Sequence, residues 1–496
     1  MGMAQQMGKD TEFLDPATVR ENSFGFYIRD QWQVTRKLTV TYGTRYEIYP
    51  FAHRDHFGGD LYDPATNNVY LGGINGVPFN SGLNSGHGDL APRLGIAYRL
   101  NEKTVIRAGF GISVDPNSFR ALRDAYPAII SQQFSGANSF LAAGTFVTGI
   151  PAFTPPVIGQ GILALPSNVG MTTFPKNYDR GYIESYNLMV QRDLGAGFNL
   201  QTGYVGTRAI RQTAALNINA APPGTGKAGQ PLYILYGNPS AISDDEPFDT
   251  TTYNSWQTQL TRRVGTAMFG AVYTFSRAID YSDNDDAALT FPLAADWSRD
   301  KALAGYDRTH NFELYGAYAL PFGPGHALAS HGVLAVIAGG WQINSILARA
   351  SGTPFTVTSS GTSLNAPGST QTADQVLPNV QILGQVGPNS SYFNPLAFAP
   401  VTGVRFGASG RDILRGPGLF NLDGSVFRTF RVRENINLQF RAEAFGLTNT
   451  PQFSNPGANV SSATFSGGAI KALNGYTVIS SSTGERQLRF ALKLLF

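Results

Sequence analysis

The fold class is decided by the last ten residues, Gln487-Leu488-Arg489-Phe490-Ala491-Leu492-Lys493-Leu494-Leu495-Phe496. A β-strand places alternate side chains on opposite faces, so one face of this segment is entirely apolar and the other is mostly polar. The apolar face holds Leu488, Phe490, Leu492, Leu494 and Phe496. A soluble chain usually ends in frayed polar residues. This chain ends on an aromatic residue, as expected of a strand that lies against lipid.

Composition favours strands and glycine-rich loops over a helical enzyme. The 496 residues include 14% charged residues, 12% aromatic residues and 56 glycines, whereas soluble domains average roughly 25% charged residues. The net charge of +3 is too small to indicate a nucleic-acid partner. The absence of cysteine from the sequence excludes disulfides, thiolate metal sites and a cysteine nucleophile.

Hydropathy contains no sign of a helical membrane segment. Residues 1–10 lack the apolar stretch of a signal peptide, and no run of about 18 apolar residues exists. Mean hydropathy is −0.13. These values remain compatible with a membrane barrel, because only half of the residues in a barrel strand face lipid.

Alternation of period two recurs along the whole chain, in segments of about ten residues. We therefore predict an all-β fold, a transmembrane antiparallel β-barrel with about 13 to 16 strands in this chain. The clearest alternating segments are residues 24–34, 38–47, 93–100, 106–113, 186–191, 198–204, 256–263, 269–275, 312–320, 341–347, 422–430, 437–444 and 488–496.

The connections between these segments are of two kinds. Short turns are expected at 35–37, 101–103, 195–197, 264–266 and 432–435. Long loops are expected at 50–90, 115–180, 208–252, 278–306, 351–420 and 448–484. Short periplasmic turns at one end and long extracellular loops at the other are typical of outer-membrane barrels. The alternative is a soluble all-β sandwich or propeller.

Charged residues gather on the parity opposite the apolar one. We predict that they face the barrel lumen, where they either contact a plug and pass an anionic or polar substrate or form a paired network that solvates the wall. These residues are Arg29, Arg45, Glu47, Arg93, Arg99, Arg107, Arg441 and Glu443.

Other candidate sites are weak. The acidic run Asp280–Asp286 offers oxygen ligands suited to calcium, but it does not have the spacing of an EF-hand, and a solvated acidic loop is the alternative. There is no Gly-x-Ser-x-Gly, P-loop or His-Glu-x-x-His motif. We therefore expect no enzyme, no catalytic residues, no metal and no cofactor.

Several motifs resemble the TonB-dependent outer-membrane receptors, and in particular their Oar-like branch, whose members carry a carboxypeptidase-regulatory-like domain. The resemblance runs nearly end to end, and its motifs occur in the family's order. The motifs are Phe26-Tyr27-Ile28-Arg29-Asp30-Gln31-Trp32, Gly43-Thr44-Arg45-Tyr46-Glu47, Ala91-Pro92-Arg93-Leu94-Gly95, Ile413-Leu414-Arg415-Gly416-Pro417-Gly418, Gln439-Phe440-Arg441-Ala442-Glu443-Ala444-Phe445 and the terminal strand.

This resemblance implies uptake of a bulky, scarce solute across the Gram-negative outer membrane. It also implies a plug, a signal peptide and a barrel of about 22 strands. The plug and signal peptide are not recognised in this chain. We expect residues 1–22 to lead into the first strand and residues 23–496 to form the C-terminal part of a larger barrel.

The expected partners follow from that placement. They are outer-membrane lipid, the barrel assembly machinery that reads Leu488, Phe490, Leu492, Leu494 and Phe496 as the closing strand, and an unidentified solute. A TonB-type motor would act only through the N-terminal part not recognised here. The alternatives are a passive or structural barrel in adhesion or envelope integrity, and a soluble secreted all-β protein.

Overall fold

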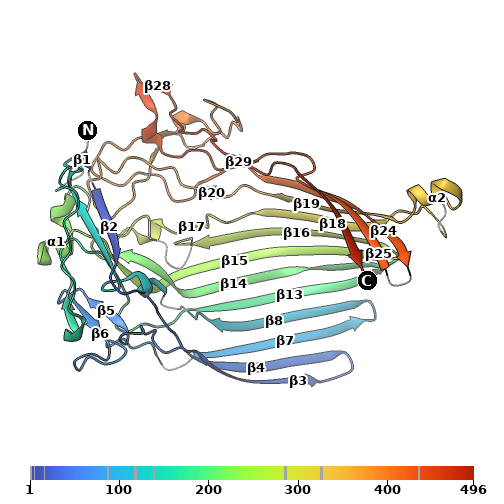
Figure 1. Cartoon of the computed structure of the whole chain (residues 1–496), viewed down its shortest axis with the longest axis horizontal. Coiled ribbons are helices and arrows are strands. Elements are labelled where there is room, and N and C mark those ends of the chain that lie inside the picture. Colours follow the sequence, from blue (N-terminus) through green and yellow to red (C-terminus); the bar gives the residue numbers. More distant parts are fainter. Residues whose placement is uncertain are drawn as a thin grey trace.

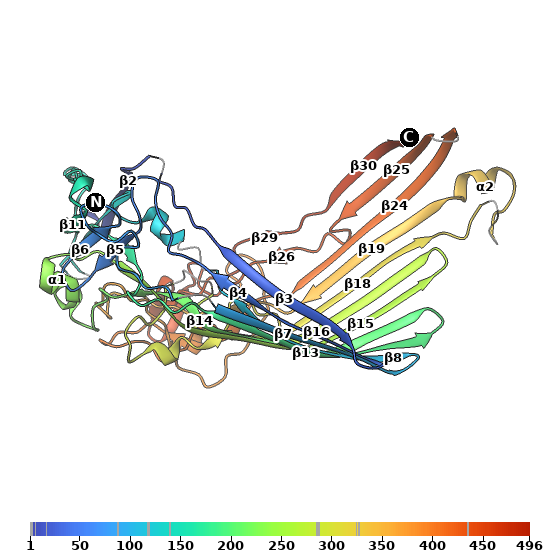
Figure 2. The same cartoon turned by 90° about the horizontal axis from the view of Figure 1, so that it is seen from below.

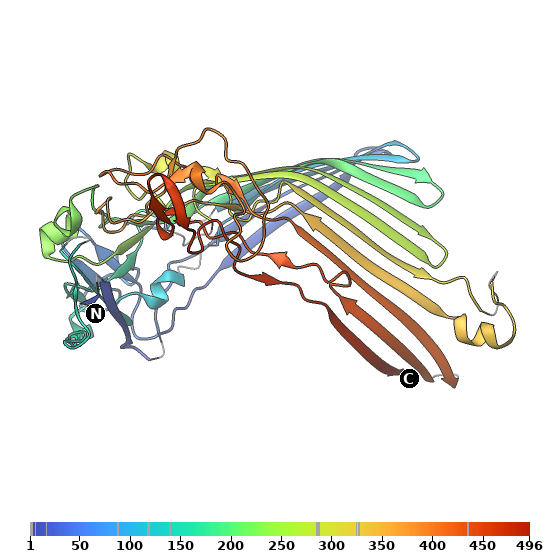
Figure 3. The same ribbon diagram turned by 90° about the horizontal axis from the view of Figure 1, so that it is seen from above.

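One large twisted sheet and a cap of packed loops make up the molecule. The computed structural model describes residues 3–4, 6–15, 17–86, 89–116, 120–137, 140–283, 288–323, 325, 328–433 and 436–496. The sheet lies at one end of the long axis and the cap at the other (Figure 1). In the perpendicular views the sheet curls along its width, which gives it a trough shape (Figures 2 and 3).

Within the described residues, thirteen strands follow one another along the main sheet, each pairing antiparallel with the next, and the short strands β12 (Met171–Thr173) and β17 (Ala302–Leu303) pair with it off this path. The order of the thirteen strands in the sheet is their order in the sequence, as in an up-and-down meander. They are β3 (Phe24–Gln33), β4 (Leu38–Ile48), β7 (Asp89–Asn101), β8 (Thr104–Val114), β13 (Tyr182–Gly195), β14 (Phe198–Asn217), β15 (Ile242–Val264), β16 (Ala267–Asp280), β18 (His310–Ala319), β19 (Trp341–Ala350), β24 (Leu419–Arg433), β25 (Ile436–Phe445) and β30 (Gln487–Leu495).

The remaining elements are short and most of them belong to the loops. The short strands are β1 (Met3–Ala4), β2 (Gln6–Glu12), β5 (Asp60–Asp63), β6 (Asn68–Leu71), β9 (Ile129–Ser135), β10 (Gly144–Thr145), β11 (Ile162–Ala164), β12 (Met171–Thr173), β17 (Ala302–Leu303), β20 (Pro354–Phe355), β21 (Asp374–Gln375), β22 (Phe398–Ala399), β23 (Leu414–Arg415), β26 (Gln452–Phe453), β27 (Thr464–Ser466), β28 (Ala469–Ala472) and β29 (Ser482–Thr483). The helical segments are α1 (Pro231–Tyr236), α2 (Gly332–Ala338), η1 (Arg120–Asp124), η2 (Ile158–Gln160), η3 (Gly226–Gly229), η4 (Trp297–Arg299), η5 (Pro395–Ala397) and η6 (Val460–Ser462). Among the described residues, no helix is both long and apolar enough to cross a membrane.

The connections are one-sided, as predicted from the sequence, except that residues 320–340 form a long connection between β18 and β19 at the end of the tight turns. Tight turns join β3 to β4, β7 to β8, β13 to β14 and β15 to β16 at one end (Figure 1). The turn between β13 and β14 is tight because Gly195, Ala196 and Gly197 all have positive φ, at 82°, 48° and 77°. Glycine adopts this backbone conformation without steric cost.

The predicted loop 208–252 is the main correction to the expected connections. β14 runs on to Asn217 and β15 starts at Ile242, so the connection is residues 218–241. Asp244, Asp245 and Glu246, which resemble a loop in sequence, extend the ladder by pairing with Leu216, Ala215 and Ala214. Pairing with a neighbouring strand overrides the low strand propensity of aspartate.

The register gives the sheet one apolar face. Directly paired residues of antiparallel strands project on the same side, so a row of partners can be followed across the sheet. One row crosses eight strands from β3 to β16 and contains only apolar residues: Trp32, Val40, Ile96, Ala108, Leu188, Tyr204, Trp256 and Phe275. A second row on the same face contains Leu200, Leu260, Ala271, Leu314, Leu347 and Leu422. This is the pattern of a lipid-facing surface.

The buried hydrophobic clusters lie mainly in the cap rather than in the sheet. One joins the segments around β5, β6, β9 and β11, with Val69 and Leu71 fully buried. A second joins the connection 351–418 to residues 446–486 around Phe393, Phe398 and Tyr476. A long loop that packs its own core keeps a fixed shape, because its apolar burial offsets the entropy of ordering it.

Candidate functional site: the polar face and the loop cap

All eight charged residues predicted to face the lumen lie on the polar face of the sheet. The register places Arg29 on β3, Arg45 and Glu47 on β4, Arg93 and Arg99 on β7, Arg107 on β8, and Arg441 and Glu443 on β25, opposite in parity to the apolar rows. The structure divides them into separate groups.

Three of these arginines gather on β3, β4 and β7. Arg29 and Arg93 are both direct register partners of Gly43, so the three residues form one row with a gap at the glycine. Together with Arg45 they line a cavity of about 440 Å³. The Nε of Arg45 lies 2.7 Å from the Oε1 of Glu47. Among the described residues, the ion pair of Arg45 with Glu47 is the only one that these three arginines make. The cavity therefore has excess positive charge and is suited to an anionic group.

Arg441 and Glu443 lie near the other edge of the sheet. The Nε of Arg441 donates to Oε1 of Gln439 at 2.7 Å, and its guanidinium stacks on Phe427 at 4.7 Å. Glu443 is the register partner of Arg489 on β30. These contacts resemble a wall-solvating network. Arg99 and Arg107 do not line the cavity formed around Gly43.

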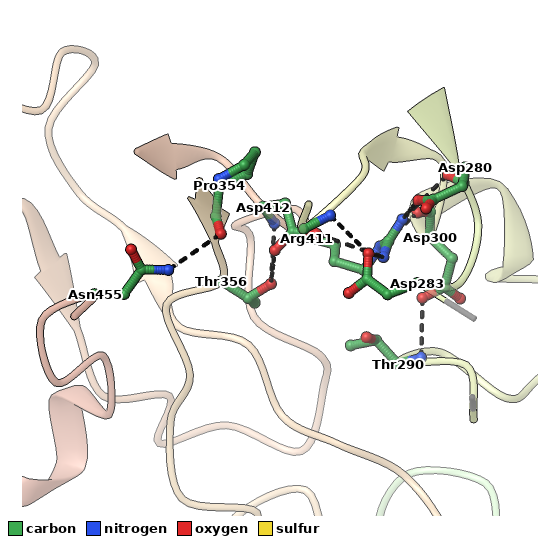
Figure 4. Close-up of polar contacts among 10 residues, drawn as sticks. Asp280, Asp283, Thr290, Asp300, Pro354, Thr356, Arg411, Asp412 and Asn455 are labelled. Atoms are coloured by element: carbon green, nitrogen blue, oxygen red, sulfur yellow. Dashed lines mark hydrogen bonds and ion pairs between the residues drawn. The ribbon is translucent and has the colours of Figure 1, made fainter. Parts of the chain in front are cut away.

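A buried ion cluster joins the loops of the cap (Figure 4). At its centre Arg411, from the connection 351–418, donates from Nη2 to the carboxylate of Asp280 at the end of β16. Its Nη1 lies 3.3 Å from Asp283 and 3.4 Å from Asp412, and its Nε donates to the backbone carbonyl of Asp300 at 2.9 Å. The side chains of Arg411 and Asp280 are 7% and 0% exposed. One guanidinium therefore holds two long connections together.

Burial also changes the acidity of this region. Loss of solvation raises the pKa of Asp300 to about 6, although the N–H groups of Phe291 and Thr290 and the charge of Arg411 oppose the shift. The pKa of Asp412 is also raised, mainly by burial and against the attraction of Arg411. Desolvation disfavours a carboxylate, and neighbouring positive charge only partly restores it.

The predicted calcium ligands are used differently. Asp280 and Asp283 both face Arg411, which supplies the positive charge that a cation would supply. Asn284, Asp285 and Asp286 lie outside the described residues. Within the described part of the chain, no group of three or more histidine, aspartate or glutamate side chains is placed to hold a metal ion.

Sequence reasoning missed the arginines that organise the cap. Arg411 was not a candidate, and neither was Arg54, whose Nε and Nη2 donate to one oxygen of Asp60 at 3.0 and 2.8 Å. Both arginines lie in loops, where no periodic pattern marks a buried position. The local signal for Arg411 is its place two residues before Ile413, where a motif of the receptor resemblance begins.

A larger cavity lies where the sheet meets the cap, and Ser351, Gly352 and Gly418 of the connection 351–418 contribute to its lining. It measures about 790 Å³ and is lined by residues including Tyr273, Phe312, Arg349 and Phe420. These four are successive register partners on the apolar face. The strand residues of this cavity therefore lie on the apolar face of the sheet.

Four of the five predicted closing residues lie on β30, the last strand of the sheet, and Phe496 directly follows its last residue. β30 pairs antiparallel with β25 along its whole length, so that Phe490 faces Ala442 and Leu492 faces Phe440. Leu488, Phe490, Leu492 and Leu494 are 55–71% exposed, and Phe496 is 97% exposed. β30 and β3 are the two edges of the described sheet.

A sheet with one apolar face, one polar face and loops collected at one end defines an outer-membrane β-barrel wall. The chain belongs to the family described as Outer membrane beta barrel domain, which matches residues 1–489. It is therefore a protein of the outer membrane, and the soluble alternative is wrong.

Solved structures that align with this chain include two receptors and a transporter. The siderophore receptor PirA from Acinetobacter baumannii shares 11% identity with a TM-score of 0.46, over 96% of this chain and 46% of that one. The ferripyoverdine receptor of Pseudomonas aeruginosa shares 10% identity with a TM-score of 0.44, over 96% and 38%. The outer-membrane transporter YddB from Escherichia coli shares 9% identity with a TM-score of 0.44, over 95% and 53%. The chain thus spans about half the length of these proteins or less. No curated protein matches the sequence.

Proposed function

We propose that this chain forms the wall and outer mouth of a receptor-type transporter that takes up a bulky, scarce, anionic or polar solute. The motif resemblance supports placing it among the TonB-dependent receptors, in their Oar-like branch. In this proposal the chain is the C-terminal portion of a larger barrel. A TonB-type motor acts through an N-terminal portion, whereas these residues bind and guide the solute.

The observation that carries the proposal is the cavity around Gly43, where Arg29, Arg45 and Arg93 meet on the polar face. Arginine binds carboxylates and phosphates through paired hydrogen bonds, which makes it the preferred residue for such ligands. The cap supports the same interpretation, because loops with their own cores present a preformed surface. A preformed surface loses less entropy when a solute binds.

Accumulation of labelled solutes tests this function. Cells carrying the full receptor would be offered a panel of labelled anionic solutes, with and without an uncoupler that collapses the proton-motive force. We expect at least one solute to accumulate only in energised cells. The double change Arg29→Gln and Arg93→Gln is expected to reduce that uptake at least tenfold. Arg36→Gln, in the turn after β3, is the matched control and is expected to leave it unchanged.

The cap also favours a second function, a passive or structural barrel in adhesion. Its hydrophobic clusters give the loops a stable outer surface independent of transport. In that case deletion of the protein would change surface adhesion or envelope integrity. No solute would then accumulate in an energy-dependent way, and the arginine changes would have no effect on uptake.

A further inference from the structure

Helix α2 lies in the connection between β18 and β19, at the end of the sheet where the other connections are tight turns. It protrudes beyond those turns (Figures 1 and 2). Its four bulky side chains are exposed: Val333 73%, Leu334 69%, Val336 67% and Ile337 61%. Isolated exposed apolar residues are common on proteins, but four within five positions form a patch that requires a covering surface.

The exposed side chains share one side of the helix. At about 100° per residue, positions 333, 334, 336 and 337 cover an arc of roughly 160°. Ala335 lies opposite this arc and is only 4% exposed. Its carbonyl accepts a hydrogen bond from the N–H of Gly339 at 3.1 Å. Ala335 thus faces the rest of the protein, and the four bulky side chains face away from it.

The sequence around α2 is also uncharged. No Asp, Glu, Lys or Arg occurs from residue 314 to residue 348. By contrast, the turn after β3 contains Arg36 and Lys37, and the turn after β7 contains Glu102 and Lys103. The charged side chains of those two turns are suited to exposure to water. The connection that holds α2 lacks the charge that an aqueous surface normally carries.

Side chains of the apolar face hold the C-terminal end of α2. Trp341 and Arg428 are direct register partners on that face. Trp341 Nε1 and Arg428 Nη1 both donate to the carbonyl of Ile337, at 3.0 and 2.8 Å, and Arg428 Nη2 donates to the carbonyl of Val336. The Arg428 guanidinium also stacks on Trp341 at 5.5 Å. The helix is therefore continuous with the lipid-facing surface.

We propose that α2 lies in the membrane boundary on the turn side of the barrel, with Val333, Leu334, Val336 and Ile337 among the lipid acyl chains. Interfacial helices place one apolar face at that depth, and tryptophan and arginine commonly anchor there. The occupant is lipid rather than a second copy of the chain. Four side chains cannot supply the roughly 1,200 Å² that a stable protein interface buries.

The cysteine-free sequence allows a direct test. Leu334→Cys, and separately Val336→Cys, would each be labelled with an environment-sensitive fluorophore in the full chain reconstituted in phosphatidylcholine vesicles. We expect blue-shifted emission, quenching by spin-labelled lipids and protection from aqueous iodide. Lys103→Cys, in the turn after β7, is the matched control and is expected to show the reverse. Arg428→Gln is expected to lower the lipid quenching of both helix labels.

Two outcomes would overturn the proposal. The first is iodide access at both helix positions equal to that at position 103. The second is blue-shifted emission that ignores spin-labelled lipid and depends on the protein-to-lipid ratio, which would identify a second copy of the chain as the covering surface.

Discussion

Replacing Arg411 with methionine is expected to separate the loops of the cap while leaving the sheet folded. Methionine retains much of the side-chain volume and removes the charge and all the hydrogen-bond donors. Asp280, at the end of β16, would then hold a fully buried carboxylate that has lost its pairing cation. Asp412 would lose its cation as well (Figure 4).

The magnitude follows from the burial of the pair. Removing one partner of a buried ion pair costs about 3–5 kcal/mol, because the other charge remains desolvated. At about 1.4 kcal/mol per tenfold change, the equilibrium for opening the cap should rise by roughly two to four powers of ten. Adding Asp280→Asn to Arg411→Met should recover part of this loss, since it removes the uncompensated charge.

Trp297 provides the assay. Its ring stacks on Phe248, with centroids 4.7 Å apart, and the neighbouring Arg299 donates to the carbonyl of Gly407 in the connection that contains Arg411. In a variant with Trp32, Trp256 and Trp341 changed to phenylalanine, Trp297 emission would follow opening of the cap in urea. Heat-modifiable migration in gels would show whether the barrel stays folded.

Arg405→Met is the matched control in the same connection. Arg405 also makes a two-bond ion pair, with Asp374 at 2.8 and 2.7 Å, but its side chain is 57% exposed. Solvent already screens that pair, so its loss should leave the urea midpoint unchanged. The reasoning is refuted if Arg411→Met shifts the midpoint no more than Arg405→Met does.

Three further predictions use the same protein. Because the pKa of Asp300 is about 6 in the fold and 3.8 ordinarily, the folded cap takes up a proton first, so protonation of this residue should add up to about 3 kcal/mol to the stability of the cap as the pH falls from 7 to 4. The Trp297 midpoint of the parent should therefore rise relative to that of Asp300→Asn over this pH range, and a difference between the two midpoints that does not change with pH would contradict the prediction. Gly352→Ala should disrupt the cap, since a Cβ there overlaps the carbonyl of Gly416, whereas Gly361→Ala meets nothing within 4 Å and should be silent in the same titration. Phe496→Ser should lower the amount of full receptor assembled in the outer membrane by the barrel assembly machinery, and equal amounts in membrane fractions would count against a signal role for the terminal strand.

The sheet could be predicted from the sequence because its constraint is local. A strand between lipid and a polar interior must alternate residue by residue, so Phe490, Leu492 and Leu494 reveal their face without knowledge of any partner. The turn positions could be predicted too, since tight turns need particular residues, as at Gly195 and Gly197.

The cap could not be predicted in this way, since its contacts join residues far apart in the chain. Arg411 meets Asp280 across 131 positions, and Arg54 approaches the carbonyl of Leu122 across 68. No period marks either arginine as buried. Helix α2 was missed for another reason. Its short apolar run between two strands has no polar face to give a helical pattern.

The direction of the two edge strands has a consequence for closure. β3 runs from the cap toward the turns, and so does β30, because twelve reversals of direction separate thirteen strands. Direct hydrogen bonding between β30 and β3 would create one parallel strand pair in an otherwise antiparallel sheet. Antiparallel closure instead requires an odd number of strands between β30 and β3, whichever chain supplies them. The total is then even, the parity found in single-chain bacterial barrels.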